Sequence, residues 1–209
     1  MKKTIIVEVI AITIFSAIVK AGILKHLDNL LFNMLYIGSE TFVLVFSETA
    51  SIYLFAALII VIAVADLWRY RKLSLFSAGL ALLLILNSLL VYAIKLFFQI
   101  PRPLTGNNVS TDILDLIEKF SYPSGHTARA FALASYYSIN TKINGKIMGF
   151  LYIWAVSIAL TRLLLGVHWF SDVIGGAAIG ILTAQLTQII LPYTIKALPL
   201  RIARKLLRS

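Results

Sequence analysis

The sequence predicts an all-α protein of the membrane: a bundle of six transmembrane helices that forms one domain over residues 1–209. Hydrophobic residues make up 60% of the chain and charged residues only 13%, and the mean hydropathy is +0.91. A soluble surface cannot hide that much apolar area. Apolar runs long enough to cross a bilayer recur along the chain, and the net charge of +10 gathers on one side of those runs.

Charged residues and turn residues bound six apolar runs, and each run predicts one span. The expected spans are residues 4–24, 41–65, 74–98, 124–140, 147–164 and 172–191. The first resembles a signal peptide, but its apolar run is long for one, and Lys20 lies close to where cleavage would fall. We therefore expect the first span to be retained as an anchor.

The charge distribution predicts the orientation. Six spans place both termini on one side, which then carries 12 basic and 2 acidic residues, while the other side carries 7 of each. Cytoplasmic loops are the basic ones. We therefore expect a plasma-membrane protein with both termini in the cytoplasm, and the basic composition needs no nucleic-acid partner.

Three short segments have helical stripes outside the spans. Apolar stripes at 27–35 and 113–120 suit helices lying in the outer interface, and the second, within residues 112–120, would cover a site as a lid. Ordinary loop packing is the alternative. The basic stripe at 201–208 suits either a topology signal or a helix on anionic lipid.

The chain has no cysteine and only three histidines, His26, His126 and His168. A disulfide framework and a thiolate metal site are therefore excluded, and a histidine metal cluster is not expected.

Three basic residues abut apolar runs at the outer ends of the spans: Lys95, Arg102 and Arg162. One such residue alone would be interpreted as a side chain that snorkels to the interface. Several that converge on one membrane face indicate a function. Arginine offers a rigid fork of donors that matches phosphate oxygens, and lysine adds a point charge.

The sequence PSGH, residues 123–126, opens the expected fourth span. A helix start presents free N–H groups and the positive end of the helix dipole, which together bind anions. Gly125 would let the backbone approach such an anion closely. The plain alternative is a helix start with Ser124 as its cap.

His168 and Asp172 are four residues apart, so on a helix they share one face. The carboxylate would hold one ring nitrogen of the imidazole and leave the other free to attack a substrate. A simple ion pair at a helix end is the alternative.

In combination these motifs resemble the type 2 phosphatidate phosphatase family, which shares its site with bacterial acid phosphatases and vanadium haloperoxidases. The family pattern is K-x6-RP, then PSGH, then SR-x5-H-x3-D. The chain matches it between residues 95 and 172, with Thr161 where the family usually has serine. The matching residues outside PSGH are Lys95, Arg102, Pro103, Arg162, His168 and Asp172.

The resemblance implies a role for each residue. His168 would be the nucleophile and form a phosphohistidine, Asp172 would orient it, and His126 would protonate the leaving oxygen and later activate water. The groups expected to hold the phosphate are Lys95, Arg102, Ser124, Gly125 and Arg162. The cations would do the electrostatic work that Mg²⁺ does in many phosphotransferases, so neither a metal nor another cofactor is expected.

The expected function is hydrolysis of phosphate from a membrane lipid phosphate or diphosphate at the outer face. A polyprenyl diphosphate is the first candidate, because the chain is small and has no soluble domain. Phosphatidate and phosphatidylglycerol phosphate are alternatives, as is transfer of the phosphoryl group to another acceptor. A small transporter would use Glu48 and Arg129 as a polar path, but the sequence has no internal repeat. No feature of the sequence predicts an oligomeric state.

Overall fold

The computed structural model describes residues 2–38, 40–104, 119–141 and 144–197. This part of the chain is all-helical, as expected, apart from an isolated bridge between Pro101 and Phe120. Its helices are α1 (Lys2–Lys20), α2 (Lys25–Leu35), α3 (Thr41–Glu48), α4 (Ile52–Tyr70), α5 (Leu75–Phe98), α7 (Gly125–Asn140), α8 (Gly145–Leu164) and α9 (Phe170–Ala197).

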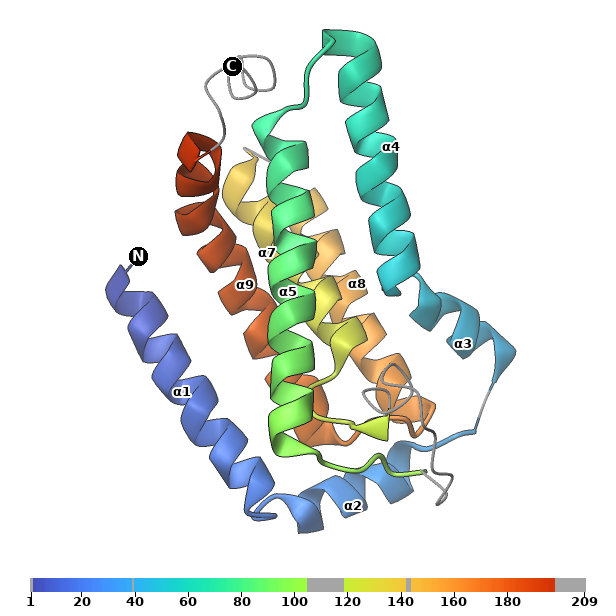
Figure 1. Cartoon of the computed structure of the whole chain (residues 1–209). Coiled ribbons are helices and arrows are strands. Elements are labelled where there is room, and N and C mark those ends of the chain that lie inside the picture. The colour runs from blue at the N-terminus through green and yellow to red at the C-terminus, as the bar shows by residue number, and fades with distance from the viewer. Residues whose placement is uncertain (1, 39, 105–118, 142–143, 198–209) are drawn as a thin grey trace.

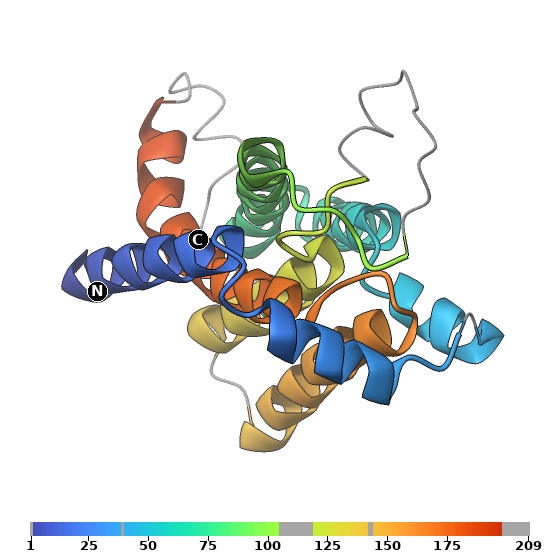
Figure 2. The ribbon, with the colours of Figure 1, turned by 90° about the horizontal axis from the view of Figure 1, so that it is seen from below.

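Helix α7 lies inside the bundle, where it packs against α5, α8 and α9 (Figure 1, Figure 2). Alanines on several faces of α7 are fully buried, at positions 128, 130, 132 and 134. A Cβ at Gly180 of α9 would lie 2.4 Å from the carbonyl oxygen of Ala128. Small residues therefore let the backbones of α7 and α9 approach closely, as at many interfaces between membrane helices.

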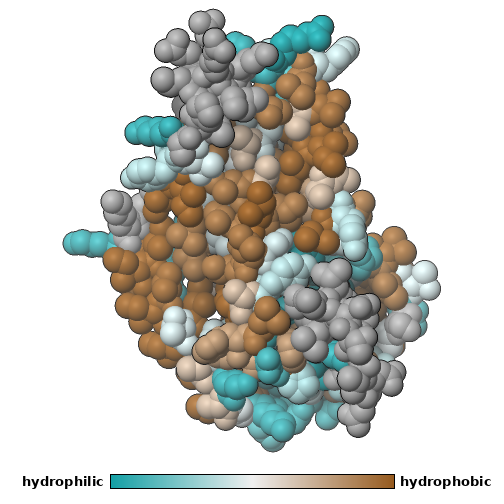
Figure 3. All heavy atoms as spheres, viewed as in Figure 1, coloured by the Kyte–Doolittle hydropathy of each residue, from teal (hydrophilic) through white to brown (hydrophobic). Residues whose placement is uncertain are grey.

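The outer surface of the bundle suits a bilayer. Large apolar side chains such as Phe42, Tyr53 and Trp68 are more than 80% exposed. In Figure 3 hydrophobic residues cover the middle of the face shown, and hydrophilic residues gather toward its two ends. Four helices are long and apolar enough to cross a membrane, namely α4, α5, α8 and α9.

The expected count of six spans is not confirmed. The described residues contain four such helices, or five if α1 and α2, which meet at a bend of 81°, are counted as one broken span. Helix α7 has only 16 residues, about 24 Å at the usual rise per residue, which is less than the hydrocarbon thickness of about 30 Å. Because its neighbours surround it, α7 does not have to meet lipid along its whole length.

The expected span 41–65 is divided into two helices. Helix α3 ends at Glu48 and α4 starts at Ile52, where the hydroxyl of Ser51 caps the new helix by accepting a hydrogen bond from the amide of Leu54 at 3.3 Å. The apolar composition of both pieces conceals this break, because serine, threonine and alanine fit within a helix as well.

The apolar stripe at 27–35 lies in α2, which runs across the lower end of the bundle in Figure 1. The suggested lid lies outside the described residues except for Lys119 and Phe120, and the basic stripe at 201–208 lies outside them entirely.

Candidate active site

The predicted residues meet at the end of the bundle that carries the N-termini of α7 and α9 and the C-termini of α5 and α8. A cavity of about 320 Å³ opens there. Six of the eight predicted site residues line it: Lys95, Arg102, Gly125, His126, Arg162 and His168. The other two, Ser124 and Asp172, are fully buried beside it.

His168 lies in the turn that joins α8 to α9. Gly166 makes this turn with a φ of +65°, and a Cβ at that position would lie 2.7 Å from the ring of Tyr36. Only glycine takes this conformation at no steric cost. The turn brings the imidazole under Asp172, with 3.3 Å between His168 Nδ1 and Asp172 Oδ2.

Asp172 has three contacts that hold it in place. Its Oδ2 also accepts a hydrogen bond from the backbone amide of Trp169 at 2.8 Å, and its Oδ1 accepts one from the hydroxyl of Ser121 at 3.3 Å. A carboxylate on Nδ1 selects the tautomer in which the proton is on that nitrogen. The lone pair of His168 is then on Nε2.

The surroundings of His168 favour the neutral imidazole. Burial, followed by the positive charges of Arg102, Lys95 and Arg162, holds the pKa of His168 well below its ordinary value. A neutral ring with a free lone pair at neutral pH is the form that a nucleophile requires.

Hydrogen bonds join the end of α5, near Lys95 and Arg102, to the segment before α7. The amide of Ser121 donates to the carbonyl of Ile100 at 2.7 Å. The ammonium of Lys95 donates to the carbonyl of Phe120 and, at 3.5 Å, to that of Ser121. Lys95 is thereby held to the backbone of Phe120, which lies 25 residues further along the chain and just before PSGH.

Ser124 is the N-cap of α7. Its hydroxyl accepts hydrogen bonds from the amide of Thr127 at 3.5 Å and the hydroxyl of Thr127 at 3.0 Å. The alternative of a capping serine is therefore realised, and phosphate binding by this hydroxyl stays a prediction. The hydroxyl of Thr161 likewise bonds within its own helix, because it donates to the carbonyl of Ile158 at 2.6 Å.

Two charged residues that were expected only for a transporter also line the cavity. Glu48 Oε1 lies 3.4 Å from Nε2 of His126, and Arg129 Nη2 lies 3.4 Å from Nδ1 of the same ring. Arg129 follows His126 by three residues on α7, a spacing that places both on one helix face. No local pattern indicates Glu48, because the fold alone brings α3 to the site.

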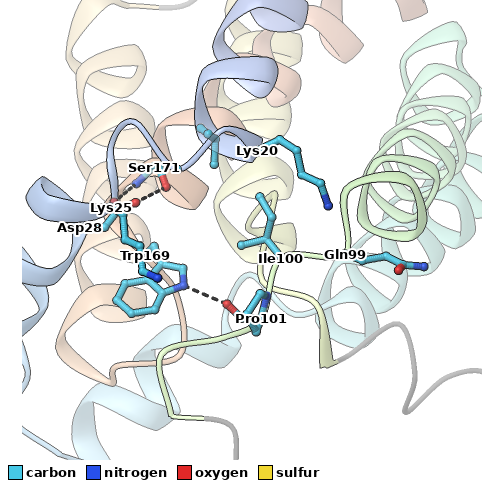
Figure 4. Close-up of a pocket in the computed structure, with 10 residues that line it drawn as sticks. Lys20, Lys25, Asp28, Gln99, Ile100, Pro101, Trp169 and Ser171 are labelled. Carbon is cyan, nitrogen blue, oxygen red and sulfur yellow. Dashed lines mark hydrogen bonds between the residues drawn. The ribbon is translucent and has the colours of Figure 1, made fainter.

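A second cavity lies beside the first turn of α9, and Figure 4 shows residues that line it, among them Asp28, Pro101, Trp169 and Ser171. The indole of Trp169 donates to the carbonyl of Pro101 at 2.9 Å, beside Arg102. Asp28 of α2 accepts hydrogen bonds from the amide and the hydroxyl of Ser171 at 2.9 and 2.7 Å. These contacts anchor the first turn of α9, which carries Asp172.

The chain also matches a known protein family. Residues 76–196, more than half of the chain, match the model of the PAP2 superfamily. This protein belongs to the PAP2 superfamily. The family expected from the motifs is thus confirmed, and residues 1–75, with Asp28 and Glu48, lie outside the matched region.

Two solved structures resemble this PAP2 protein. One is described as the first transmembrane PAP2-type phosphatidylglycerolphosphate phosphatase, from Bacillus subtilis, with a TM-score of 0.67 and 19% identity over 94% of this chain and 98% of that one. The other is Aquifex aeolicus LpxE, with a TM-score of 0.58 and 29% identity over 79% of this chain and 94% of that one. The first likeness shows the fold.

A curated relative is the lipid A 1-phosphatase of Porphyromonas gingivalis, which is 41% identical over 69 residues. The match covers 32% of this chain and spans 15% of the relative's length. The expected enzyme class, a phosphatase, agrees with the two relatives that are named by their activity.

Proposed function

We propose that this protein hydrolyses the phosphate of a membrane lipid phosphate without a metal ion, through a phosphohistidine on His168. The observation that carries the proposal is the buried His168–Asp172 pair facing a cavity lined by cations. The carboxylate keeps one ring nitrogen protonated and directs the lone pair of the other toward the cavity.

The first step follows from this geometry. Nε2 of His168 attacks the phosphorus, the bond from phosphorus to the lipid oxygen breaks, and His126 gives a proton to that oxygen. Lys95, Arg102 and Arg162 surround the phosphoryl oxygens and stabilise their charge in the transition state. In the second step water attacks the phosphohistidine, His126 takes its proton, and inorganic phosphate leaves.

Two substrate classes are candidates. The first class is a polyprenyl diphosphate. The second class, a lipid phosphomonoester, is supported by the relatives, because the Bacillus subtilis enzyme is named for phosphatidylglycerol phosphate and the Porphyromonas gingivalis enzyme for lipid A. We place the reaction at the outer face of the plasma membrane on the strength of the charge distribution.

Rapid acid-free quenching of the purified protein with ³²P-labelled phosphatidate or polyprenyl diphosphate tests the mechanism. We expect phosphate release that survives EDTA, a base-stable and acid-labile label on the protein, and loss of both in His168→Ala. The other imidazole at the cavity, His126, has Arg129 rather than a carboxylate beside its Nδ1, so it does not replace His168. Activity that EDTA abolishes and Mg²⁺ restores would exclude the proposed chemistry. Label passing to a lipid acceptor instead of water would identify a phosphotransferase.

A further inference from the structure

The break between α3 and α4 passes beside the phosphate cavity. We call residues 47–51 the strap. Three side chains of α7 and α8 hold it: Arg129 Nε donates to the carbonyl of Ala50 at 2.8 Å, Arg162 Nη1 to the hydroxyl of Ser47 at 2.7 Å, and the Trp154 indole to the hydroxyl of Thr49 at 3.1 Å. Ser47, Ala50 and Ser51 are buried.

Glu48 is the charged residue of the strap and is about half exposed, with its carboxylate 3.4 Å from Nε2 of His126. All other charged groups that line the cavity are cations. The groups that face His126 are Lys95 of α5, Arg102 beyond α5, Arg129 of α7, Arg162 of α8, Glu48 of α3 and the ring of His168.

An anionic side chain beside a phosphate site has a cost. It repels the phosphate of every substrate and so weakens binding. Its position next to the proton donor His126 indicates a second effect that offsets this loss. Burial and then four cations lower the pKa of His126 and disfavour its protonated form. The negative charge of Glu48, 3.4 Å from Nε2, acts in the opposite direction. The carboxylate therefore favours the imidazolium, which is the form that protonates a leaving oxygen.

The two substrate classes need this proton to different degrees. A phosphomonoester releases an alkoxide, a strong base that departs only with a proton. A lipid diphosphate releases a lipid phosphate, a much weaker base that needs less help. The leaving phosphate of the diphosphate would also carry its negative charge toward His126, next to Glu48, where like charges repel.

We propose that Glu48 is a specificity-determining residue that directs this site to lipid phosphomonoesters and against lipid diphosphates. This inference rests on the proposed function and selects between its two substrate classes. Glu48 lies outside the region that matches the PAP2 family.

The test compares wild type with Glu48→Gln on phosphatidate and polyprenyl diphosphate in the same mixed micelles. The wild type should have the higher kcat/KM for phosphatidate. In Glu48→Gln, kcat for phosphatidate should fall, because His126 donates its proton less readily. KM for the diphosphate should also fall, because one repulsive charge is removed. The ratio of kcat/KM for phosphatidate to kcat/KM for the diphosphate should therefore decrease by about tenfold or more. A loss of folding alone would lower both activities together.

Glu40→Gln is the matched control, because Glu40 is an exposed carboxylate at the other end of α3, where its side chain makes no capping bond. Glu40→Gln should leave the ratio of the two kcat/KM values as in the wild type. Glu48→Asp keeps the negative charge, so its ratio should lie between those of the wild type and Glu48→Gln. A wild type that prefers the diphosphate, or a ratio unmoved in a stable Glu48→Gln, overturns the inference. No hydrolysis of any lipid by the wild type would instead overturn the proposed function.

Discussion

At the residue scale, the protonation of His168 is controlled by its neighbours. Asp172 fixes the tautomer, while burial and the nearby cations disfavour a second proton on the ring. In the proposed mechanism the cations have two tasks, since they would bind the phosphate and also keep the imidazole of His168 neutral before the phosphate arrives.

The pH dependence of the reaction should reflect this arrangement. A group with a lowered pKa is neutral above that pKa, so His168 is ready to attack throughout the neutral range, and its acid limb in kcat/KM should lie below pH 6.5. Among the cations, Arg102 has the largest effect on this pKa. Arg102→Gln should therefore move the acid limb of the kcat/KM profile to higher pH, in addition to reducing its height.

The comparison uses one substrate for both proteins, so the ionisation of the substrate cancels. The position of the limb separates this effect from simple loss of phosphate binding, which would lower the profile at every pH alike. A limb that stays in place, or moves to lower pH, would show that Arg102 does not control the protonation of His168.

At the element scale, the active site depends on how closely α7 and α9 approach. The amide of Ser124 donates to the carbonyl of Asp172 at 3.0 Å, so the two helix starts are joined directly. One turn further along, Gly176 of α9 faces the carbonyl of Ser124, and Gly180 then faces Ala128. Side chains on α9 at these positions would separate the PSGH motif from the nucleophile.

Gly180→Ala should therefore destabilise the protein and lower its activity. The new Cβ would lie 2.4 Å from a backbone oxygen and 2.8 Å from a backbone nitrogen of α7, and neither can move without shifting the helix. Overpacking of this kind costs about 1–3 kcal/mol. Thermal unfolding in detergent would measure the loss.

Gly149→Ala in α8 is the control, because a Cβ there meets no atom within 4 Å. Alanine is the better helix former by about 0.5–1 kcal/mol, so this variant should be as stable as wild type or slightly more so. Equal effects of the two substitutions would argue against close packing of α7 on α9.

At the scale of the whole molecule, the proposed compartment depends on the orientation in the membrane. The site is at one end of the bundle, and the charge distribution predicts that this end faces outward. Lys25 of α2 lies on the side of the site, whereas Lys146 begins α8 at the opposite end.

Because the chain has no cysteine, single cysteines at these two exposed lysines report the orientation without background. In intact cells a membrane-impermeant thiol reagent should label Lys25→Cys and should label Lys146→Cys only after permeabilisation. The reverse pattern would place the active site at the cytoplasmic face, so that its substrate would be a lipid of the inner leaflet.

Much of the site could be predicted from local sequence. The residues proposed to act on the phosphate occur in three short motifs, and chemistry constrains both their types and their spacings: an arginine fork, a glycine at a helix start, and a histidine one turn from its carboxylate. The apolar composition likewise predicts helices in a membrane. A composition pattern does not show where one apolar run divides, and so the break after Glu48 was missed.

By itself, then, the sequence determined the all-helical membrane fold, the family, and the eight residues proposed for the phosphate chemistry, because each depends on contacts or spacings within a few turns of chain. Only the tertiary structure decided that Asp28 braces the start of α9 and that Glu48 faces His126. The contacts of Asp28 and Glu48 join residues 143 and 78 positions apart, respectively. Such partners are selected by the packing of helices, which no local pattern records.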